Sequence, residues 1–327
     1  MRSVVSLLPL GLIAALLAGC ADASADPSAA GSSPAAAPVR VDNCGVDVTV
    51  GAPPQRVVTI KSSTTEMLLA LGVGDRIVGT AYPDGPVPEE WAADAPELPV
   101  LAERVPSQEV VLEQEPDLVY AGWESNFSAD GAGERDSLEA LGVHTYVSPS
   151  ACKGEGYRPN PLTLDDVFAE IREVAGIFRV EEAADELIAQ QQSRLEAVEP
   201  LATETTALWF SSGTDTPFVG AGIGAPQLVM DTLGLTNIAS GIEDSWAPFN
   251  WEAVVDADPD VIVLVDADWN SVEQKIGVLE SNPATANLTA VREGRYLTID
   301  FAATEAGVRT VPAVVELADQ LAALGLD

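Results

Sequence analysis

The sequence predicts an α/β protein built of two lobes that one rigid helix joins. Three observations lead to this prediction. Strand-like runs of apolar and β-branched residues alternate with helical patterns, which is typical of mostly parallel sheets. A pattern of eleven residues occurs twice, 143 positions apart, so the two lobes share a local design. Between the two copies lies a long helical stretch, which is the expected connection.

The first 43 residues are expected to direct export rather than to fold. Met1-Arg2 is a short positive start, and residues 4–18 are almost wholly apolar but too few to span a membrane, as in a secretory signal. Leu17-Ala-Gly-Cys20 resembles the bacterial lipobox. We therefore expect a signal peptide over residues 1–19 and a lipid on Cys20, the alternative being a plain signal with an incidental cysteine. Residues 20–43 are rich in Ala, Ser and Pro and are expected to form a flexible tether.

Residues 44–162 are expected to form the first lobe. Its strand-like runs lie at residues 57–60, 76–81, 117–122 and 143–147. A helix between the first two runs is expected to end at Gly72, and a similar stretch later in the chain ends at Gly234.

Residues 163–200 are strongly helical and lie between the lobes. Thr163 and Asp166 have the spacing of a capping pair at a helix start. The stretch is expected to break near Phe178-Arg-Val180 and then to run from Glu181 until Pro200 stops it, over about 28 Å. Such a rod would allow the lobes only a small closing angle.

Residues 201–327 are expected to form the second lobe, with strand-like runs at residues 206–211, 260–266 and 295–300. The repeated pattern is Glu109-Val-Val-Leu-Glu-Gln-Glu-Pro-Asp-Leu-Val119 in the first lobe and Glu252-Ala-Val-Val-Asp-Ala-Asp-Pro-Asp-Val-Ile262 in the second. Ser107 and Asn250 lie two residues before the glutamates, where each can cap the helix that follows. Each copy therefore predicts a short helix, a Pro-Asp turn and a buried strand.

Composition argues against several functions. Acidic residues outnumber basic ones 51 to 16, and a formal charge of −35 does not suit nucleic acids or anionic membranes. The single histidine, His144, excludes a multi-histidine metal site and lies in a strand-like run, where a structural role is expected. In an exported chain whose Cys20 carries lipid, Cys44 and Cys152 remain, and we expect them to form a disulfide. Two buried thiols are the alternative.

These features together resemble a family of solute-binding proteins. The lipobox, the tether, the Arg56-Val-Val-Thr-Ile60 strand, the paired Glu-(x)6-Pro-Asp units and the bridging helix are similar to the class III periplasmic binding proteins, which serve ABC importers of ferric siderophores, haem and cobalamin. The resemblance implies two Rossmann-like lobes with a small-molecule ligand between them. It also implies an extracytoplasmic lipoprotein, held at the outer face of the cell membrane through its N-terminal lipid. The implied partners are an ABC permease dimer and its ATPase subunits.

The resemblance implies that Glu109 and Glu252 dock to arginines of the permease. The alternative is that each acid merely stabilises its helix, because a carboxylate in a first turn is favoured by the helix dipole. Two such acids at equivalent positions of the two lobes favour the docking role.

The ligand site is expected where open α/β sheets bind ligands, at the carboxyl ends of their strands. Together with the cleft-facing segments that the resemblance implies, this rule selects loops that carry several of the few cations and two tryptophans at matching positions. The expected ligand-binding residues are Lys61, Ser62, Ser63, Thr64, Arg104, Trp123, Asn126, Phe127, Ser212, Gly213, Gly220, Gly222, Trp269, Asn270, Lys275, Phe301 and Arg309.

Cations and aromatic rings at one cleft suggest an anionic, flat ligand. Segments such as Ser62–Gly72 and Tyr120–Arg135 resemble an actinobacterial subgroup assigned to import of a deazaflavin coenzyme precursor of the F420-0 type. A ferric siderophore, haem or cobalamin is the alternative. An exported enzyme or a sensor module is the alternative from another class, but no nucleophile elbow is present, and acid pairs arise by chance among 51 acids. We expect no enzyme activity, no cofactor and no bound metal.

Overall fold

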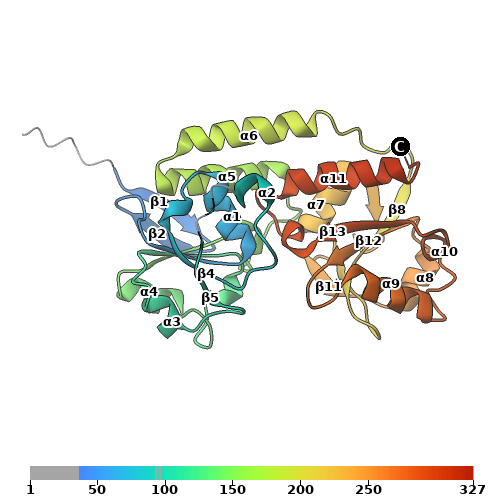
Figure 1. The fold of residues 1–327 in the computed structure, drawn as a ribbon, viewed down its shortest axis with the longest axis horizontal. Helices are drawn as coiled ribbons and strands as arrows, with labels where there is room; N and C mark the ends of the chain where they lie inside the picture. Colours follow the sequence, from blue (N-terminus) through green and yellow to red (C-terminus); the bar gives the residue numbers. More distant parts are fainter. Residues whose placement is uncertain (1–36, 93–94, 96, 327) are drawn as a thin grey trace, which may run out of the picture. The chain divides into compact units, whose positions relative to one another are not determined.

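The computed structural model describes residues 37–92, 95 and 97–326 (Figure 1). The expected signal peptide over residues 1–19, the lipid site at Cys20 and most of the expected tether lie outside the described residues. Among the residues that are described, no helix has both the length and the apolar character needed to cross a membrane.

The described chain begins with a β-hairpin of β1 (Val39–Asn43) and β2 (Val46–Val50). Its two-residue turn holds Cys44 at φ 55° and Gly45 at φ 83°, the left-handed pair that a tight hairpin needs. The prediction of a flexible tether up to residue 43 is therefore wrong for β1. Its valines pack on the core and alternate with polar residues that face solvent, the period of a half-buried strand.

The first lobe is built on a five-stranded parallel sheet in the order β5-β4-β3-β6-β7. The strands are β3 (Val57–Ile60), β4 (Ile77–Ala81), β5 (Val100–Ala102), β6 (Leu118–Ala121) and β7 (His144–Val147). The helices are α1 (Ser62–Ala70), α2 (Glu89–Ala92), α3 (Gln108–Leu112) and α4 (Arg135–Ala140). The four predicted strands are present, and β5 is a short edge strand within the apolar run 98–102, which was not among those predicted.

Two helices follow the first lobe, α5 (Leu164–Phe178) and α6 (Glu181–Leu195). Thr163 and Asp166 form the expected capping box, and the break falls at Arg179, whose φ of 61° ends α5. The regular helix α6 stops at Leu195, before the expected Pro200. It packs on α5 and on α11 (Thr310–Ala323) of the second lobe, so it lies along helices of both lobes (Figure 1).

The second lobe has a mixed sheet in the order β11-β9-β8-β12-β13, with β10 also paired to β8. The strands are β8 (Thr205–Ser212), β9 (Phe218–Gly220), β10 (Leu235–Asn237), β11 (Trp246–Pro248), β12 (Val261–Asp266) and β13 (Tyr296–Asp300). The helices before α11 are α7 (Ala225–Leu233), α8 (Trp251–Ala257), α9 (Val272–Ser281) and α10 (Thr289–Glu293). β8, β12 and β13 match the predicted runs, whereas β9, β10 and β11 are three-residue strands that the sequence did not indicate.

The repeated pattern folds alike in both lobes. α3 leads to β6 and α8 leads to β12, and β6 and β12 are interior strands of their sheets. The caps are as expected: the side chain of Ser107 accepts a hydrogen bond from the Val110 amide, and that of Asn250 accepts one from the Ala253 amide.

One apolar core continues from the first lobe through the connecting helices into the second. It includes Met67 and Leu68 of α1 and Ile171 of α5, and it reaches Leu228 and Val311 in the second lobe. A hydrogen bond crosses at the same place, where the side-chain amide of Gln191 on α6 donates to the carbonyl of Val308 at 2.9 Å. The two-lobed α/β fold with a bridging helix is thereby confirmed.

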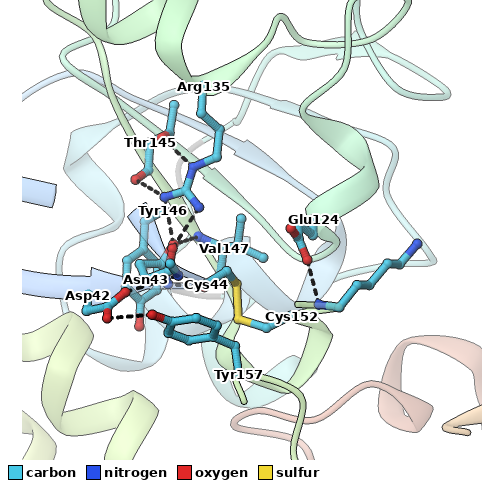
Figure 2. The surroundings of a disulfide bond; sticks show 12 residues. Asp42, Asn43, Cys44, Glu124, Arg135, Thr145, Tyr146, Val147, Cys152 and Tyr157 are labelled. Carbon is cyan, nitrogen blue, oxygen red and sulfur yellow. Dashed lines mark hydrogen bonds between the residues drawn. A yellow bond between two sulfur atoms is a disulfide. The ribbon is translucent and has the colours of Figure 1, made fainter. Parts of the chain in front are cut away.

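The hairpin is fastened to the first lobe by a disulfide and a polar network (Figure 2). Cys44 and Cys152 are bonded, as predicted, and close a loop with a sequence separation of 108. Asn43 is buried and pairs with both backbone groups of Val147, each at 2.8 Å. Arg135 donates to the carbonyl and the side chain of Asn43 (Figure 2). By the chain-entropy account, a loop of this length stabilises the fold by roughly 4 to 5 kcal/mol.

Glu170 of α5 carries a buried carboxyl group that contacts Tyr120 of the first lobe. Tyr120 donates to Glu170 at 2.8 Å, and Tyr146 donates to Glu173 at 2.6 Å. Burial raises the pKa of Glu170 to about 7, and the hydrogen bond from Tyr120 only partly opposes that rise. The folded protein therefore favours the protonated acid.

Stability should depend on pH through Glu170. Because its pKa is raised above the unfolded value near 4.5, the folded state is favoured most below that value. This contribution falls as pH rises from about 4.5 to 7, by roughly 3 kcal/mol. Urea unfolding of wild type and Glu170→Gln measures this effect. As pH rises across this range, the unfolding free energy of the wild type should fall relative to that of Glu170→Gln.

Glu186→Gln is the matched control, because it removes the same charge from an exposed position on α6. If the unfolding free energies of wild type and Glu170→Gln change in parallel between pH 4.5 and 7, the pKa of Glu170 is not raised in the folded protein.

Candidate functional site

A cavity of about 600 Å³ lies between the lobes. The first lobe contributes Trp123, Ser125 and the segment 150–153, followed by Arg158. The second lobe contributes residues of β9, of β11 and the two residues before it, and of the turn after β13. These are Phe218, Asp244, Ser245, Trp246, Phe301, Thr304, Glu305 and Ala306, with Ser211, Gly224 and Ala225 also in the lining. Because both lobes line it, a ligand here would contact both.

Aromatic rings form much of the cavity wall. Trp123 follows β6, and its backbone amide donates to the buried side chain of Asn126 at 3.1 Å, which fixes the turn that carries the indole. In the second lobe, Phe218 and Trp246 are stacked, with ring centroids 6.3 Å apart and planes 9° from parallel. Their strands pair antiparallel, so the sheet itself sets this stack. Such walls suit a flat, partly apolar ligand.

Both positive and negative side chains line the cavity. Lys153 and Arg158 are exposed cations on the segment that the disulfide fastens. Arg158 is 3.3 Å from Asp244 of the second lobe. Glu305 accepts a hydrogen bond from the indole of Trp123 at 3.0 Å. Burial raises the pKa of Glu305, although the charge of Lys61 and the bond from Trp123 oppose the rise.

Lys61 lies directly behind the aromatic wall. It has a φ of 88° at the end of β3, a backbone conformation that costs a side-chain-bearing residue about 1–3 kcal/mol and that is typical of functional sites. Its ammonium is fully buried, is paired with Asp84, and lies 3.9 Å from the ring centroid of Trp123 and 5.0 Å from that of Phe301. The strand-end rule thus found a residue that supports the wall, although Lys61 does not line the cavity.

A second charged contact joins the lobes beside Lys61. Arg309 at the start of α11 donates to both carboxylate oxygens of Glu66 on α1, at 2.6 and 2.5 Å, and also to the carbonyl of Pro86. Burial raises the pKa of Glu66, and the paired guanidinium opposes that rise. Arg309 was expected to bind ligand. In the structure it forms this ion pair and does not line the cavity.

Three further predicted residues, Trp269, Asn270 and Lys275, lie near one another outside the cavity lining. Trp269 packs edge-on against Phe301 at 5.9 Å and is 61% exposed, and it does not line the cavity. Lys275 is buried and donates to the carbonyl of Asn270, and its ammonium lies 5.8 Å from the ring of Trp269. Burial lowers the pKa of Lys275 to about 8.

The remaining predicted residues of the first lobe have structural positions. Ser62, Ser63 and Thr64 form the buried first turn of α1, where Ser62 accepts a hydrogen bond from the Asp84 amide. Phe127 packs on the core near Arg135, and Arg104 is exposed. Of the residues expected in this lobe, only Trp123 lines the cavity.

The glycines of the second lobe permit close backbone contacts rather than ligand approach. A β-carbon at Gly213 would lie 2.1 Å from the carbonyl oxygen of Thr216, and one at Gly222 would lie 2.1 Å from that of Ser240. Gly220 packs against Pro226, and Ser212 ends β8 next to Ser211, which does line the cavity.

Several cavity residues were absent from the predicted set. Phe218 and Trp246 lie on three-residue strands, which are too short to be distinguished from loops by their sequence. Arg158 and the segment 150–153 follow β7, a parallel strand whose loop was not among those selected. The predicted disulfide at Cys152 was the available signal for that segment.

The two predicted docking glutamates are exposed. Glu109 lies in the first turn of α3, and Glu252 lies in the first turn of α8. His144 pairs with Glu139 at 3.1 Å on β7 and does not line the cavity. Within the described residues, no group of three or more His, Cys, Asp or Glu side chains is arranged to bind a metal.

Comparison with known proteins gives the family. The pattern of the periplasmic binding protein family matches residues 57–303, and the chain belongs to this family. The Bacillus subtilis ABC transporter substrate-binding lipoprotein YvrC is 25% identical over 95% of this chain and 94% of its own. A vitamin B12-binding protein of Yersinia pestis is 25% identical over 64% of this chain and 69% of its own.

Solved structures agree with this assignment. A periplasmic binding protein from Veillonella parvula has a TM-score of 0.77 and 26% identity, covering 87% of this chain and 97% of that one. A protein of an ABC-type Fe3+-hydroxamate transport system from Saccharomonospora viridis has a TM-score of 0.74 and 27% identity, covering 87% and 99%.

Breaking the ion pair between the lobes should destabilise the protein. Arg309→Met leaves the buried carboxylate of Glu66 without its partner, so the unfolding free energy should fall by about 3–5 kcal/mol. Adding Glu66→Gln should restore part of the loss. Urea unfolding of the two single variants and the double variant measures this coupling.

Arg172→Met is the control, because it makes the same change at an exposed position on α5. Additive effects of Arg309→Met and Glu66→Gln would show that the two residues do not stabilise each other.

Proposed function

We propose that the chain is the substrate-binding lipoprotein of an ABC importer, and that it captures an anionic, flat small ligand between its lobes. The cavity carries this proposal. It is lined from both lobes by aromatic rings, and two exposed cations, Lys153 and Arg158, stand at its wall. Family membership supports capture rather than catalysis, and the likeness to a lipoprotein relative supports lipid attachment at Cys20 on the outer face of the membrane.

The ligand that best suits this wall has a planar ring for Trp123, Phe301 and the Phe218–Trp246 stack, and an acidic group for the cations. A deazaflavin coenzyme precursor of the F420-0 type has both parts. A ferric siderophore or cobalamin is the second candidate, because relatives include proteins named for Fe3+-hydroxamate transport and for vitamin B12 binding.

Haem is a weaker candidate on the chemistry of the cavity. Protein-bound haem iron is ordinarily held by His, Met, Tyr or a Cys thiolate. None of the described residues that line this cavity is His, Met or Tyr, and its one cysteine, Cys152, is in the disulfide.

The ligand class can be tested by titrating the protein from residue 37 onward, with tryptophan fluorescence as the readout. The deazaflavin precursor and ferric siderophores are added in parallel, with correction for their absorption. Saturable quenching by the deazaflavin that is lost in Trp123→Ala supports the proposal, because that indole lines the cavity. Quenching by siderophores alone would assign the protein to iron uptake.

The docking role of Glu109 and Glu252 is the second proposal. Both acids are exposed at equivalent helix starts, as a pair of contacts to one permease dimer would require. Charge reversal to Lys at both positions should reduce uptake by cells by about tenfold or more, because like charges would face the permease arginines. Ligand affinity of the purified variant should stay unchanged.

The matched control is Glu113→Lys combined with Asp256→Lys. These two exposed acids follow Glu109 and Glu252 by four residues, so the control reverses the same number of charges close to the same helices. Loss of ligand affinity in the Glu109 and Glu252 variant, or equal loss of uptake in the control, would contradict the docking role. Normal uptake by the Glu109 and Glu252 variant would also contradict it.

A further inference from the structure

Glu305 is an acid at the wall of a cavity that was expected to attract anions. It lies in the turn after β13, close to Phe301 and Thr304, and lines the cavity with them. One carboxylate oxygen, Oε2, accepts the hydrogen bond from Trp123 Nε1. Within the described residues, no donor reaches the other oxygen, Oε1.

A cation near Glu305 favours its negative charge without forming an ion pair with it. The cation that acts on it is Lys61, whose ammonium is already paired with Asp84 behind the aromatic wall. Lys61 contacts the rings of Trp123 and Phe301, so the rings stand around the cation while the acid lines the cavity. Glu305 is half-buried, and a carboxylate with one bond and one open oxygen is a strong hydrogen-bond acceptor.

The opposite charge lies on a different element of the same cavity. Lys153 and Arg158 are carried by the segment after β7, and the backbone amide of Lys153 donates to Glu124 at 2.5 Å. The ammonium of Lys153 makes no ion pair with a described residue, whereas Arg158 is held near Asp244. The cavity thus offers an acceptor beside Trp123 and cations on the segment 150–158.

We propose that Glu305 accepts a hydrogen bond from an N–H or O–H group on the edge of the ligand's ring, while an anionic arm of the same ligand reaches Lys153 and Arg158. The ligand class is a planar ring with an edge donor and a carboxylate or phosphate arm. This inference rests on the proposed function and deepens it. A ring edge made only of deprotonated oxygens, such as those that hold ferric iron, would be repelled by Glu305.

Riboflavin 5′-phosphate is a suitable probe, because its ring has one imide N–H and its arm ends in phosphate. Lumiflavin has the ring without the arm, and 3-methyl-lumiflavin also lacks the donor. Binding to the purified full-length chain is followed by flavin fluorescence. Lumiflavin should bind more weakly than riboflavin 5′-phosphate, and Lys153→Met should weaken only the phosphate-bearing probe.

Glu305→Gln is the decisive variant. Glutamine keeps one acceptor oxygen for the Trp123 indole and replaces the other oxygen with an N–H₂ group, so the ligand's donor would face another donor. The dissociation constant of riboflavin 5′-phosphate should therefore rise by about ten- to a hundredfold. The same substitution should leave 3-methyl-lumiflavin binding nearly unchanged. Glu243→Gln is the matched control, since it removes one exposed charge near the cavity without touching the lining.

Unfolding midpoints show whether Glu305→Gln keeps the fold, and Glu305→Asp provides a second variant that retains both acceptor oxygens. Tighter or unchanged binding of riboflavin 5′-phosphate by a folded Glu305→Gln protein overturns the proposal. So does equal wild-type affinity for lumiflavin and its 3-methyl form, or the absence of any flavin binding. If a ferric siderophore still binds in that case, only the ligand class is wrong; if no candidate ligand binds, the proposed function fails as well.

Discussion

The apolar core beneath the bridging helices constrains everything else in this protein. It joins α1 of the first lobe and the connecting helix α5 to α7 and α11 of the second lobe without interruption, so the lobes share one interior at their base. Separating them there would expose core residues to water, which is unfavourable in proportion to the area exposed. Movement of the lobes is therefore confined to the region beyond this core, where the cavity lies. The walls of the cavity are therefore largely formed before a ligand binds. A ligand can favour a more closed arrangement of the lobes over a more open one only through contacts that differ between the two.

Two charged contacts stand at the boundary between this core and the cavity. The Glu66–Arg309 pair and the buried Lys61 with Asp84 both bring ionic groups to a place that water does not reach easily. Buried pairs of this kind contribute little net stability compared with apolar packing, but their strict geometry fixes orientation. Here they set the position of α11 relative to α1 and the position of Trp123 relative to Phe301. The aromatic wall is consequently organised from behind, by groups that do not line the cavity.

The architecture was predictable because the interior strands are continuous apolar runs. β8 and β12 are central and largely buried, and their apolar residues indicate this burial in the sequence. The site was less predictable because it depends on pairing between distant segments. Phe218 meets Trp246 only through the register of two three-residue strands, and Arg309 meets Glu66 across 243 positions. A loop cation reveals its charge in the sequence, but not whether an acid of the other lobe neutralises it. Lys61 was found because it follows a strand end. Its burial was not foreseen because the rings of Tyr82, Trp123 and Phe301, which are distant in sequence, surround its ammonium.

The segment between Cys152 and Leu162 is held at both ends and is unconstrained by regular structure in between. The disulfide fixes its first residue to the hairpin, and the amide of Leu162 donates to the carbonyl of Ile223 in the second lobe at 2.9 Å. Lys153 and Arg158, which carry its charge to the cavity, take part in neither anchor. No strand of either sheet lies between the anchors, where the segment is held by contacts of Lys153 with Glu124, of Tyr157 with Asp42 and of Arg158 with Asp244. This separation of anchoring from recognition makes the segment the natural place for ligand preference to diverge during evolution, and a convenient insertion point for converting the protein into a sensor for a chosen molecule.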